Sequence, residues 1–423
     1  MGGNYMFKKY TRIPLIGRIL VGIVIGVLAG VMFPSWTWID LLGDLFIGAL
    51  KAIAPLLVFL VIMAAISGYE KGADNHFGTV IILYLGATFL SAVAAVAASY
   101  FFPIKLVLSK ATTANAAGAP KDLGSIVHDL LTTAVSNPVH AVMNGDYLAI
   151  LFWAVLLGIA LQTVSKKTRD IVGDFSKMIG NVAGWIIQFA PFGIIGLIHK
   201  ALVETGTRGV VHYGQLVLLL VGTMIFVYLV VYSLMVWVLT RQNPFPLVFW
   251  TLKVSGIPAF FTRSSAVNIP INLEACQDLG LNEKSYGVSI PLGGSANSGG
   301  AAITISIMTL ATTHTLGMQF SFPLALILCF LTAIASTGVS GIAGGSLLLI
   351  PMACSLFGIS NDIAMQVVGI GFVIGVIQDS VETAVNSASD LLFTAAAEYG
   401  DLRNAGHPVN IKDAVHQANR ARA

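Results

Sequence analysis

The sequence predicts an all-α integral membrane protein. Of its 423 residues, 56% are hydrophobic and only 10% are charged, and the mean hydropathy is +0.84. Soluble globular proteins carry about 25% charged residues, so this chain has too few charges to cover a water-facing surface. Uncharged stretches of 19 or more residues also recur along it. Both observations argue for membrane lipid as the surroundings and against a soluble enzyme or a nucleic-acid partner.

Neither charge nor cysteine content indicates a further kind of partner. The 23 Lys plus Arg and the 20 Asp plus Glu leave a net charge of +3, and the basic residues fall mostly in loops. The three cysteines (Cys276, Cys329 and Cys354) form no CxxC motif and no Cys/His pair, and they lie in apolar surroundings. They predict buried free thiols and give no support for a disulfide framework or a metal-binding cysteine cluster.

Six membrane-spanning helices are predicted in the first 240 residues. Each comes from a window that is nearly free of charge and is near or above the roughly 20 residues that a bilayer-crossing helix needs. The windows cover residues 13–33, 45–69, 78–104, 147–165, 178–198 and 214–240. The connection 105–146 is expected to be an external loop, with room for a short helix within 125–143.

Loop charges orient these helices. With the N-terminus in the cytoplasm, nine Lys and Arg residues fall in cytoplasmic loops and five in outer loops. Basic residues favour the cytoplasmic side of a membrane, and the bias is clearest in the short segment 166–177. The N-terminus is therefore predicted to be cytoplasmic.

After Arg241 the apolar segments are interrupted. Segment 247–280 is interrupted by two prolines and by Arg263 with the two serines that follow it, and segment 315–361 has 47 residues without a charge around a Ser/Gly-rich run, 336–345. Backbone left unpaired in hydrocarbon costs several kcal/mol per group. Two re-entrant helical hairpins are therefore predicted, with tips at 262–265 and 336–345.

The single span 285–313 between the hairpins would invert the second copy relative to the first, which gives inverted repeats. Interrupted segments at matching places in two halves point to a transporter binding site. The simpler alternative is two tandem pairs of short Gly-containing helices with structural serines.

The last predicted span, 362–398, carries five polar residues on one face. At 100° per residue they fall within about 100° of arc, and they are Asp379, Glu382, Thr383, Asn386 and Asp390. A carboxylate near the bilayer centre costs about 2.5–3.5 kcal/mol, so this face should meet a cavity or a cationic partner. One alternative is a structural ion pair, such as Asp379 with Arg263. Asp390 is near enough to the helix end to reach the membrane interface instead.

The available donors suit a free amino acid and a metal cation together. Carboxylates and the carbonyls of unwound Gly-Asn segments are hard oxygen ligands that suit Na⁺. Helix N-termini and amides at hairpin tips suit a carboxylate.

These motifs resemble the dicarboxylate/amino acid:cation symporter family of glutamate and neutral amino acid transporters, and within it the bacterial sodium/serine-threonine symporters. The residues that carry the resemblance are Ala259–Ser265, Ser289–Gly293 with Asn297, Ser336–Ser346, and Gln378–Asn386 through Asp390. Ala190–Ile194 and Asn137-Pro138 resemble further family motifs.

The resemblance implies eight transmembrane helices, two re-entrant hairpins and a homotrimer in the bacterial inner membrane, with both termini cytoplasmic. It also implies an elevator-type transporter, in which a transport domain slides against a scaffold domain. The scaffold would comprise residues 1–77 and 125–213, the transport domain 78–124 and 214–398, and a cytoplasmic tail 399–423.

The resemblance also implies a substrate site. Asp379 would bind the substrate ammonium, and Asn386 with Ser264 and Ser265 would bind its carboxylate. Arg263, Glu382, Thr383 and the Ile342 carbonyl would lie nearby.

One or two co-transported Na⁺ ions are expected from the same resemblance. One would lie among the carbonyls of Gly293, Asn297 and Asn386 and the carboxylate of Asp390. A second would lie near Ser295, Ser336, Thr337 and Val339.

Two departures from the family pattern indicate the substrate. Where acidic amino acid carriers have an Asp and a Thr after the Asn, this chain has Gly299 and Ala301, and where they have an Arg it has Glu382. An anionic side chain would meet an anion at Glu382. The sequence therefore predicts sodium-coupled import of serine and threonine by alternating access. The alternatives are a carrier for another small neutral amino acid or a dicarboxylate, an ion channel, and a membrane enzyme with Asp379 and Glu382 as its acid and base.

Overall fold

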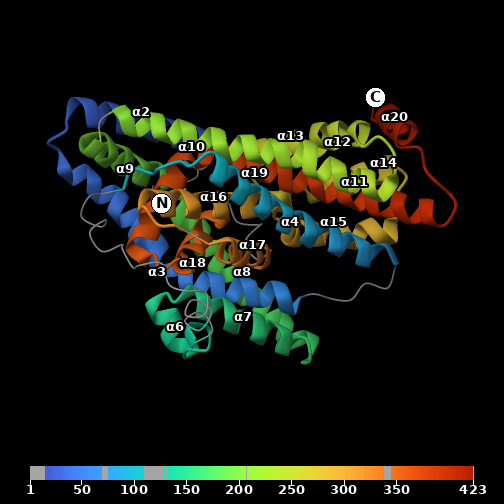
Figure 1. The fold of residues 1–423 in the computed structure, drawn as a ribbon, viewed down its shortest axis with the longest axis horizontal. Helices are drawn as coiled ribbons and strands as arrows, with labels where there is room; N and C mark the ends of the chain where they lie inside the picture. Colours follow the sequence, from blue (N-terminus) through green and yellow to red (C-terminus); the bar gives the residue numbers. More distant parts are fainter. Residues whose placement is uncertain are drawn as a thin grey trace, which may run out of the picture.

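A computed structural model describes residues 15–68, 75–108, 128, 132–205, 207–319, 321–337 and 344–422 (Figure 1). The regular secondary structure of these residues is helical throughout. Two predicted site residues, Val339 and Ile342, lie outside the described residues, as do residues 125–127 and 129–131.

The N-terminal half consists of α2 (Leu15–Met32), η1 (Thr37–Ile39), α3 (Asp40–Ser67), α4 (Asn75–Phe101), α6 (Pro138–Asn144), α7 (Tyr147–Leu161), α8 (Lys166–Gln188), α9 (Ala190–Thr205) and α10 (Thr207–Phe226). The short helix α6 falls largely within the predicted range 125–143. It begins where it does because the Asn137 side chain accepts hydrogen bonds from the backbone of Val139 and His140, at 2.9 and 3.1 Å.

The C-terminal half consists of η3 (Val227–Tyr232), α11 (Ser233–Thr240), α12 (Phe245–Thr251), η4 (Leu252–Gly256), α13 (Ile257–Thr262), α14 (Ser265–Asp278), α15 (Glu283–Ala296), α16 (Gly299–Thr315), α17 (Phe322–Ser336), η5 (Gly345–Leu349), α18 (Ile350–Ser355), α19 (Asn361–Asn404) and α20 (Ile411–Ala421).

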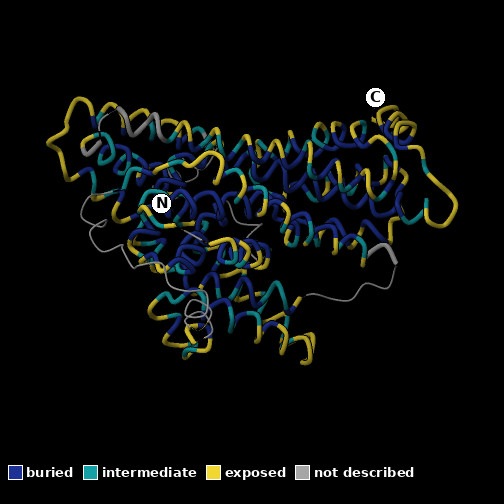
Figure 2. The backbone as a smooth tube through the Cα atoms, in the orientation of Figure 1, coloured by how far each residue is buried: buried dark blue, intermediate teal, exposed yellow. Residues whose placement is uncertain are grey.

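Several helices have the length and composition of membrane spans. Five in the described part of the chain qualify individually, and they cover Thr37–Ser67, Gly78–Phe101, Tyr213–Thr240, Phe245–Thr262 and Asn361–Asn404. Figure 2 shows that exposed residues follow the outer edges of these helices while their inner faces are buried. Many of the exposed side chains are large and apolar, such as Leu28 on α2 and Ile82 on α4, as expected of a multi-pass membrane protein.

The predicted span 178–198 is bent and comprises parts of two helices. The chain breaks at Phe189, and α8 and α9 meet at an angle of 54°. Pro191 has no backbone N–H to continue the hydrogen bonds of α8, while the N–H groups of Phe192 and Gly193 both bond to the carbonyl of Phe189 and begin a new helix.

Helix α19 is the central element of the C-terminal half. It has 44 residues, or about 66 Å at 1.5 Å per residue, which is well over the roughly 30 Å of a bilayer core. Helices α4, α10, α11 and α13 to α16 all pack against it. Helices α2, α3, α7, α8 and α9 form a second group, in which α3 packs on α7, α8 and α9, and α2 packs on α9.

The first hairpin comprises α12, η4 and α13 as one arm and α14 as the other. The arms are joined at Arg263 and Ser264, within residues 262–265, and both η4 and α13 pack on α14. Arg263 adopts a left-handed conformation, with φ +53°. The Ser264 side chain then accepts a hydrogen bond from Val267 N at 3.3 Å and starts α14.

The second hairpin comprises α17 as one arm and η5 with α18 as the other. Helix α17 ends at Ser336, and the second arm begins after Gly344. Helix α17 packs on both η5 and α18. Gly344 has φ +69°, a conformation that glycine adopts without steric cost.

The predicted span 285–313 is also interrupted. Helix α15 ends at Ala296 and α16 begins at Gly299, so Asn297 and Ser298 lie between two helices. Glycines flank the break on both sides and lower the helix propensity there. Asn297 instead directs its amide to α19, and the Ser298 N–H donates to Thr88 Oγ1 at 3.3 Å.

Candidate functional site

The five polar residues predicted on one face of the last span lie together on α19 and are buried. Asp379 and Asn386 are 3% exposed, Asp390 is 2% exposed, Glu382 is 6% exposed and Thr383 is 7% exposed. Asp390 therefore lies inside the molecule and does not reach an interface. This face of α19 is covered by α16 and by the two hairpins.

Asp379 lies between the turns of the two hairpins. Its Oδ2 accepts a hydrogen bond from Arg263 Nε at 2.7 Å and forms an ion pair with Arg263 Nη2 at 2.5 Å, and its Oδ1 accepts a hydrogen bond from Gly344 N at 3.3 Å. The ion pair that the sequence left open is thus formed. Both side chains are nearly buried, at 9% and 5% exposed, so each charge depends on the other for compensation.

Glu382 connects three elements through one carboxylate oxygen. Its Oε2 lies 2.5 Å from Gln378 Nε2, 2.7 Å from Thr304 Oγ1 and 2.9 Å from Ser346 Oγ. Thr304 belongs to α16 and Ser346 to the second hairpin. Thr304 was missed by the sequence analysis, although it follows Gly300 by one helical turn and so faces α19.

Asn297 and Asn386 connect the α15–α16 break to α19. The Asn297 amide donates to Asn386 O at 3.2 Å, Ser389 Oγ at 2.7 Å and Asp390 Oδ1 at 2.9 Å. Gly300 N donates to Asn386 Oδ1 at 2.8 Å. These bonds orient both side chains.

Oxygen atoms gather at this break. Asn297 Oδ1 is buried without a hydrogen-bond partner among the described residues, and the amide nitrogen of the same side chain donates to the Asp390 carboxylate. A Cβ built on Gly293 would lie 2.7 Å from Asp390 Oδ1, so only glycine lets this backbone approach the carboxylate. A buried amide oxygen without a donor beside a carboxylate is chemically suited to a small hard cation.

Tyr84 on α4 supports the same region and was missed by the sequence analysis. Its hydroxyl lies 3.2 Å from the carbonyls of Ser289 and Asp390 and 3.1 Å from Thr394 Oγ1. Tyr84, Thr88 and Ser91 follow the i, i+4, i+7 spacing of one helix face, which is the signal that could have identified them inside an otherwise apolar span.

The hydroxyls predicted around the second cation are used within their own helices. Ser295 donates to Leu292 O at 3.0 Å, Ser336 to Ala333 O at 3.5 Å and Thr337 to Ile334 O at 2.7 Å. Thr383 likewise donates to Asp379 O at 2.7 Å. In contrast, Ser265 Oγ at the first turn is buried without a partner in the described structure.

Comparison with known proteins identifies the family. The sequence profile of the sodium:dicarboxylate symporter family matches residues 15–399. This chain belongs to that family. The serine/threonine transporter SstT of Lacticaseibacillus paracasei is 67% identical over 418 residues, which make up 99% of this chain and 96% of that protein. Proteins of the same name from Enterococcus faecalis and Streptococcus thermophilus are 54% and 51% identical over 96% and 92% of this chain, and over 96% and 97% of their own lengths.

Membership of a symporter family makes the protein a transporter and not an enzyme. Asp379 and Glu382 therefore have another role than an acid–base pair. The resemblance stated from the motifs is confirmed over nearly the whole chain.

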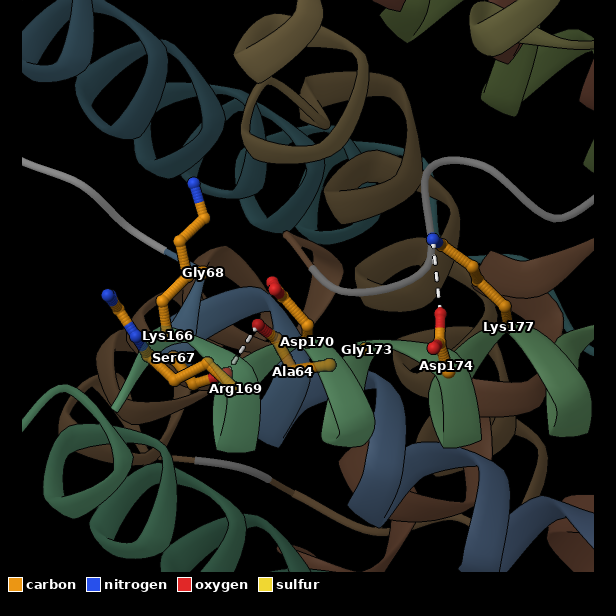
Figure 3. A pocket seen from close by; sticks show the side chains of 9 residues that line it. All are labelled: Ala64, Ser67, Gly68, Lys166, Arg169, Asp170, Gly173, Asp174 and Lys177. Atoms are coloured by element: carbon orange, nitrogen blue, oxygen red, sulfur yellow. Dashed lines mark hydrogen bonds and ion pairs between the residues drawn. The ribbon is translucent and has the colours of Figure 1, made fainter. Parts of the chain in front are cut away.

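A hollow of about 380 Å³ lies elsewhere, where α3 ends and α8 begins. Figure 3 shows its charged lining, with Lys166, Arg169 and Lys177 beside Asp170 and Asp174. Lys177 pairs with Asp174 at 3.5 Å. The predicted site residues do not line this hollow.

Proposed function

We propose that this protein is a sodium-coupled secondary symporter that imports small neutral amino acids, serine and threonine in particular, by alternating access. Asp379 carries the proposal, because it is a buried carboxylate held between the turns of two helical hairpins. Its relatives named serine/threonine transporter, at 67% and 54% identity, support the substrate.

Binding is proposed to exchange one cation for another at Asp379. Without substrate, the Arg263 guanidinium compensates the carboxylate. A substrate ammonium can take the same position, since it makes similar charge-assisted hydrogen bonds. Arg263 lies at a turn, in a left-handed conformation that nonglycine residues seldom adopt. Release of the side chain would let this turn rearrange around the substrate.

The substrate carboxylate is assigned to the opposite side of the site. Asn386 Oδ1 accepts from Gly300 N, so its amide nitrogen is directed elsewhere and can donate to a carboxylate. Ser265 Oγ is buried and without a partner at the first turn, and it offers a second donor. Ser264 caps α14 and contributes through the backbone N–H groups at that helix start.

Glu382 favours a neutral substrate over a dicarboxylate. It lies one helical turn from Asp379 on the same buried face. Like charges about 4 Å apart at an effective dielectric of 20 cost on the order of 4 kcal/mol, so a substrate with an anionic side chain would be excluded. A hydroxyl can instead donate to the carboxylate.

One or two Na⁺ ions are proposed to accompany each substrate. The oxygen cluster at the α15–α16 break, with Asn297 Oδ1 and the Asp390 carboxylate, supports the first. The second is assigned to Ser295, Ser336, Thr337 and Val339 by resemblance to the family alone.

The finer architecture is also a proposal. It has eight transmembrane helices, two re-entrant hairpins in inverted repeats and a homotrimer in the bacterial inner membrane, with cytoplasmic termini and elevator motion. Helices α2, α3 and α7 to α9 pack more extensively on one another than on the helices around α19, which supports the division into a scaffold and a transport domain.

Uptake of labelled serine into proteoliposomes tests the function. We expect accumulation with an inward Na⁺ gradient, none when K⁺ replaces Na⁺, and competition by unlabelled threonine but not by aspartate. Protein-free liposomes give the background. Uptake that ignores the Na⁺ gradient would refute the coupling, and competition by aspartate equal to that by threonine would refute the substrate class.

A further inference from the structure

Residues 405–422, after the membrane-spanning part of α19, do not form a loose tail. Helix α20 begins after Asn410, whose side chain accepts hydrogen bonds from Lys412 N at 3.0 Å and Asp413 N at 3.3 Å. Its buried residues Ile411, Ala414, Val415 and Ala418 follow the i, i+3, i+4, i+7 spacing of an amphipathic helix. The helix therefore has one face made for packing on the rest of the protein.

That face meets both arms of the first hairpin. Helix α20 packs on α12 in one arm and on α14 in the other, as Figure 1 shows near the C-terminus. Nearer the turn the arms hold each other, because η4 and α13 pack directly on α14. The contacts of α20 are therefore at the base, about 20 Å from the turn by the length of α14.

Arg422 contacts the two arms at once. Its Nε donates to Asp278 Oδ2 on α14 at 2.5 Å, and its guanidinium lies 5.7 Å from the ring centroid of Trp250 on α12. A guanidinium can make an ion pair in its plane and a cation–π contact on its face at the same time. A single side chain thus fixes the spacing of the two arms.

Gln242 holds the N-terminal end of α20 through two hydrogen bonds. Its Nε2 donates to Val409 O at 2.7 Å, and its Oε1 accepts from Ile411 N at 3.1 Å. Gln242 lies in the short link between α11 and α12, just before the first arm. The helix is therefore attached on both sides of the hairpin base.

We propose that α20 is a clamp on the base of the first hairpin, and that Arg422 is a positioning residue for the substrate-binding turn at 262–265. The proposal rests on the proposed function for its effect on transport. With the clamp in place, the two arms keep the turn in the geometry that binds substrate. When Arg422 is lost, the arms separate more often at the base, and the binding-competent fraction falls.

Cys276 is a built-in reporter of α14 leaving its packed position, because it is buried on the side of α14 that faces α15 and α19. It lies on α14 two residues before Asp278 and is fully buried. The other cysteines, Cys329 and Cys354, belong to the second hairpin, and Cys329→Ala with Cys354→Ala leaves Cys276 as the single thiol. Maleimide modification of Cys276 then measures how often the arm opens, independently of any transport.

The test compares Arg422→Glu with Arg420→Glu in this background. Both make the same charge change at the C-terminal end of α20, but Arg422 makes an ion pair and a cation–π contact with the two arms, and Arg420 makes neither kind of contact in the described structure. For Arg422→Glu we expect Cys276 to react about ten times faster and the KM for serine to rise about three-fold at an unchanged maximal rate, because apparent affinity scales with the competent fraction. Arg420→Glu should change neither, and the swap Arg422→Glu with Asp278→Arg should restore both in part, because it re-forms the ion pair to α14 but not the cation–π contact with Trp250. Asp278→Asn provides a milder variant if Arg422→Glu fails to fold.

Unchanged Cys276 reactivity in both Arg422→Glu and Asp278→Asn would overturn the clamp. Faster reactivity with an unchanged KM would overturn the positioning role. If the unmodified protein shows no sodium-dependent serine uptake, the proposed function fails, while the reactivity of Cys276 still decides whether α20 clamps the hairpin.

Discussion

At the scale of single residues, the pairing of Arg263 with Asp379 decides how the site works. A carboxylate on α19 without a counterion would be a buried anion that only a bound cationic ligand could compensate. The guanidinium 2.5 Å away makes it one partner in an exchange. Substrate affinity then depends on the difference in free energy between two ion pairs of Asp379, one with Arg263 and one with the substrate ammonium.

Asp379→Asn is expected to abolish serine transport while leaving the protein folded. The neutral amide loses the charge-assisted contact with the substrate ammonium, worth roughly 1.5–3 kcal/mol, and it leaves Arg263 without its partner. Uptake of labelled serine measures the loss. Asp362→Asn is the matched control, since Asp362 is on the same helix with its side chain 70% exposed. Undiminished uptake by Asp379→Asn would refute its role.

Glu382 is expected to set the preference for substrate side-chain charge. Glu382→Arg should lower serine uptake and admit some aspartate, because the sign of the charge is reversed. The gain should be partial, and it should grow with Ala301→Thr, which adds a hydroxyl for the distal carboxylate.

Glu382→Gln should retain serine transport and weaken discrimination against aspartate, since it keeps an acceptor for Thr304 and Ser346 without the charge. Competition between labelled serine and unlabelled aspartate measures both variants. A ratio that is the same in both variants as in the original protein would put Glu382 outside the binding site.

At the scale of elements, the α15–α16 break depends on Gly299. A Cβ built there would coincide with the Tyr232 hydroxyl and lie 2.7 Å from Ser91 Oγ, and these two hydroxyls are hydrogen-bonded to each other at 2.9 Å. They fill the space into which a side chain at position 299 would project. The protein therefore has neither an acidic side chain nor room for one at this point.

Gly299→Ala is expected to destabilise the protein by about 1–3 kcal/mol through overpacking, and Tyr232→Phe should recover part of the loss by removing the obstructing oxygen. Thermal unfolding of the purified protein measures the change. Gly287→Ala on α15 is the matched control, because its Cβ would meet nothing within 4 Å. Equal melting temperatures for Gly299→Ala and Gly287→Ala would contradict this packing argument.

The helix face of α19 could be predicted because its polar residues repeat with the helical period along one continuous element. Of the partners of that face, Arg263 could be named only as one alternative, and Thr304 was missed, since they come from segments 116 and 78 residues away. The bend at Pro191 and the break after Asn297 interrupt windows that hydropathy alone treats as continuous. Helix α20 carried its own signals, the cap at Asn410 and the apolar spacing from Ile411, and these were overlooked in a segment regarded as a tail.

At the scale of the whole molecule, the two groups of helices meet where α2, α3 and α9 pack on α19 and where α9 packs on α10. Lys51 on α3 pairs with Asp362 at the start of α19 at 2.5 Å. Both side chains are largely exposed, so the pair adds little stability. A contact of this kind can form and break as the two groups move, which suits the sliding proposed for transport.

We expect one or two Na⁺ ions per substrate for the whole cycle. Gly299 and Ala301 provide no side-chain oxygen for a further ion, and Tyr232 fills the space beside Gly299. Reversal potentials in proteoliposomes with varied Na⁺ and serine gradients measure the stoichiometry. A value of three or more would show that other groups replace the missing ligands.

The Arg263–Asp379 pair also affects the return step of the transport cycle, in which the carrier moves without substrate. After releasing its cargo, a carrier must return across the hydrocarbon, and an uncompensated carboxylate would oppose that return by several kcal/mol. An internal counterion removes this barrier without a second transported species. In the proposed cycle, the empty carrier can therefore return to the outward-facing state. The protein can then accumulate its substrate and is not limited to exchanging one amino acid for another.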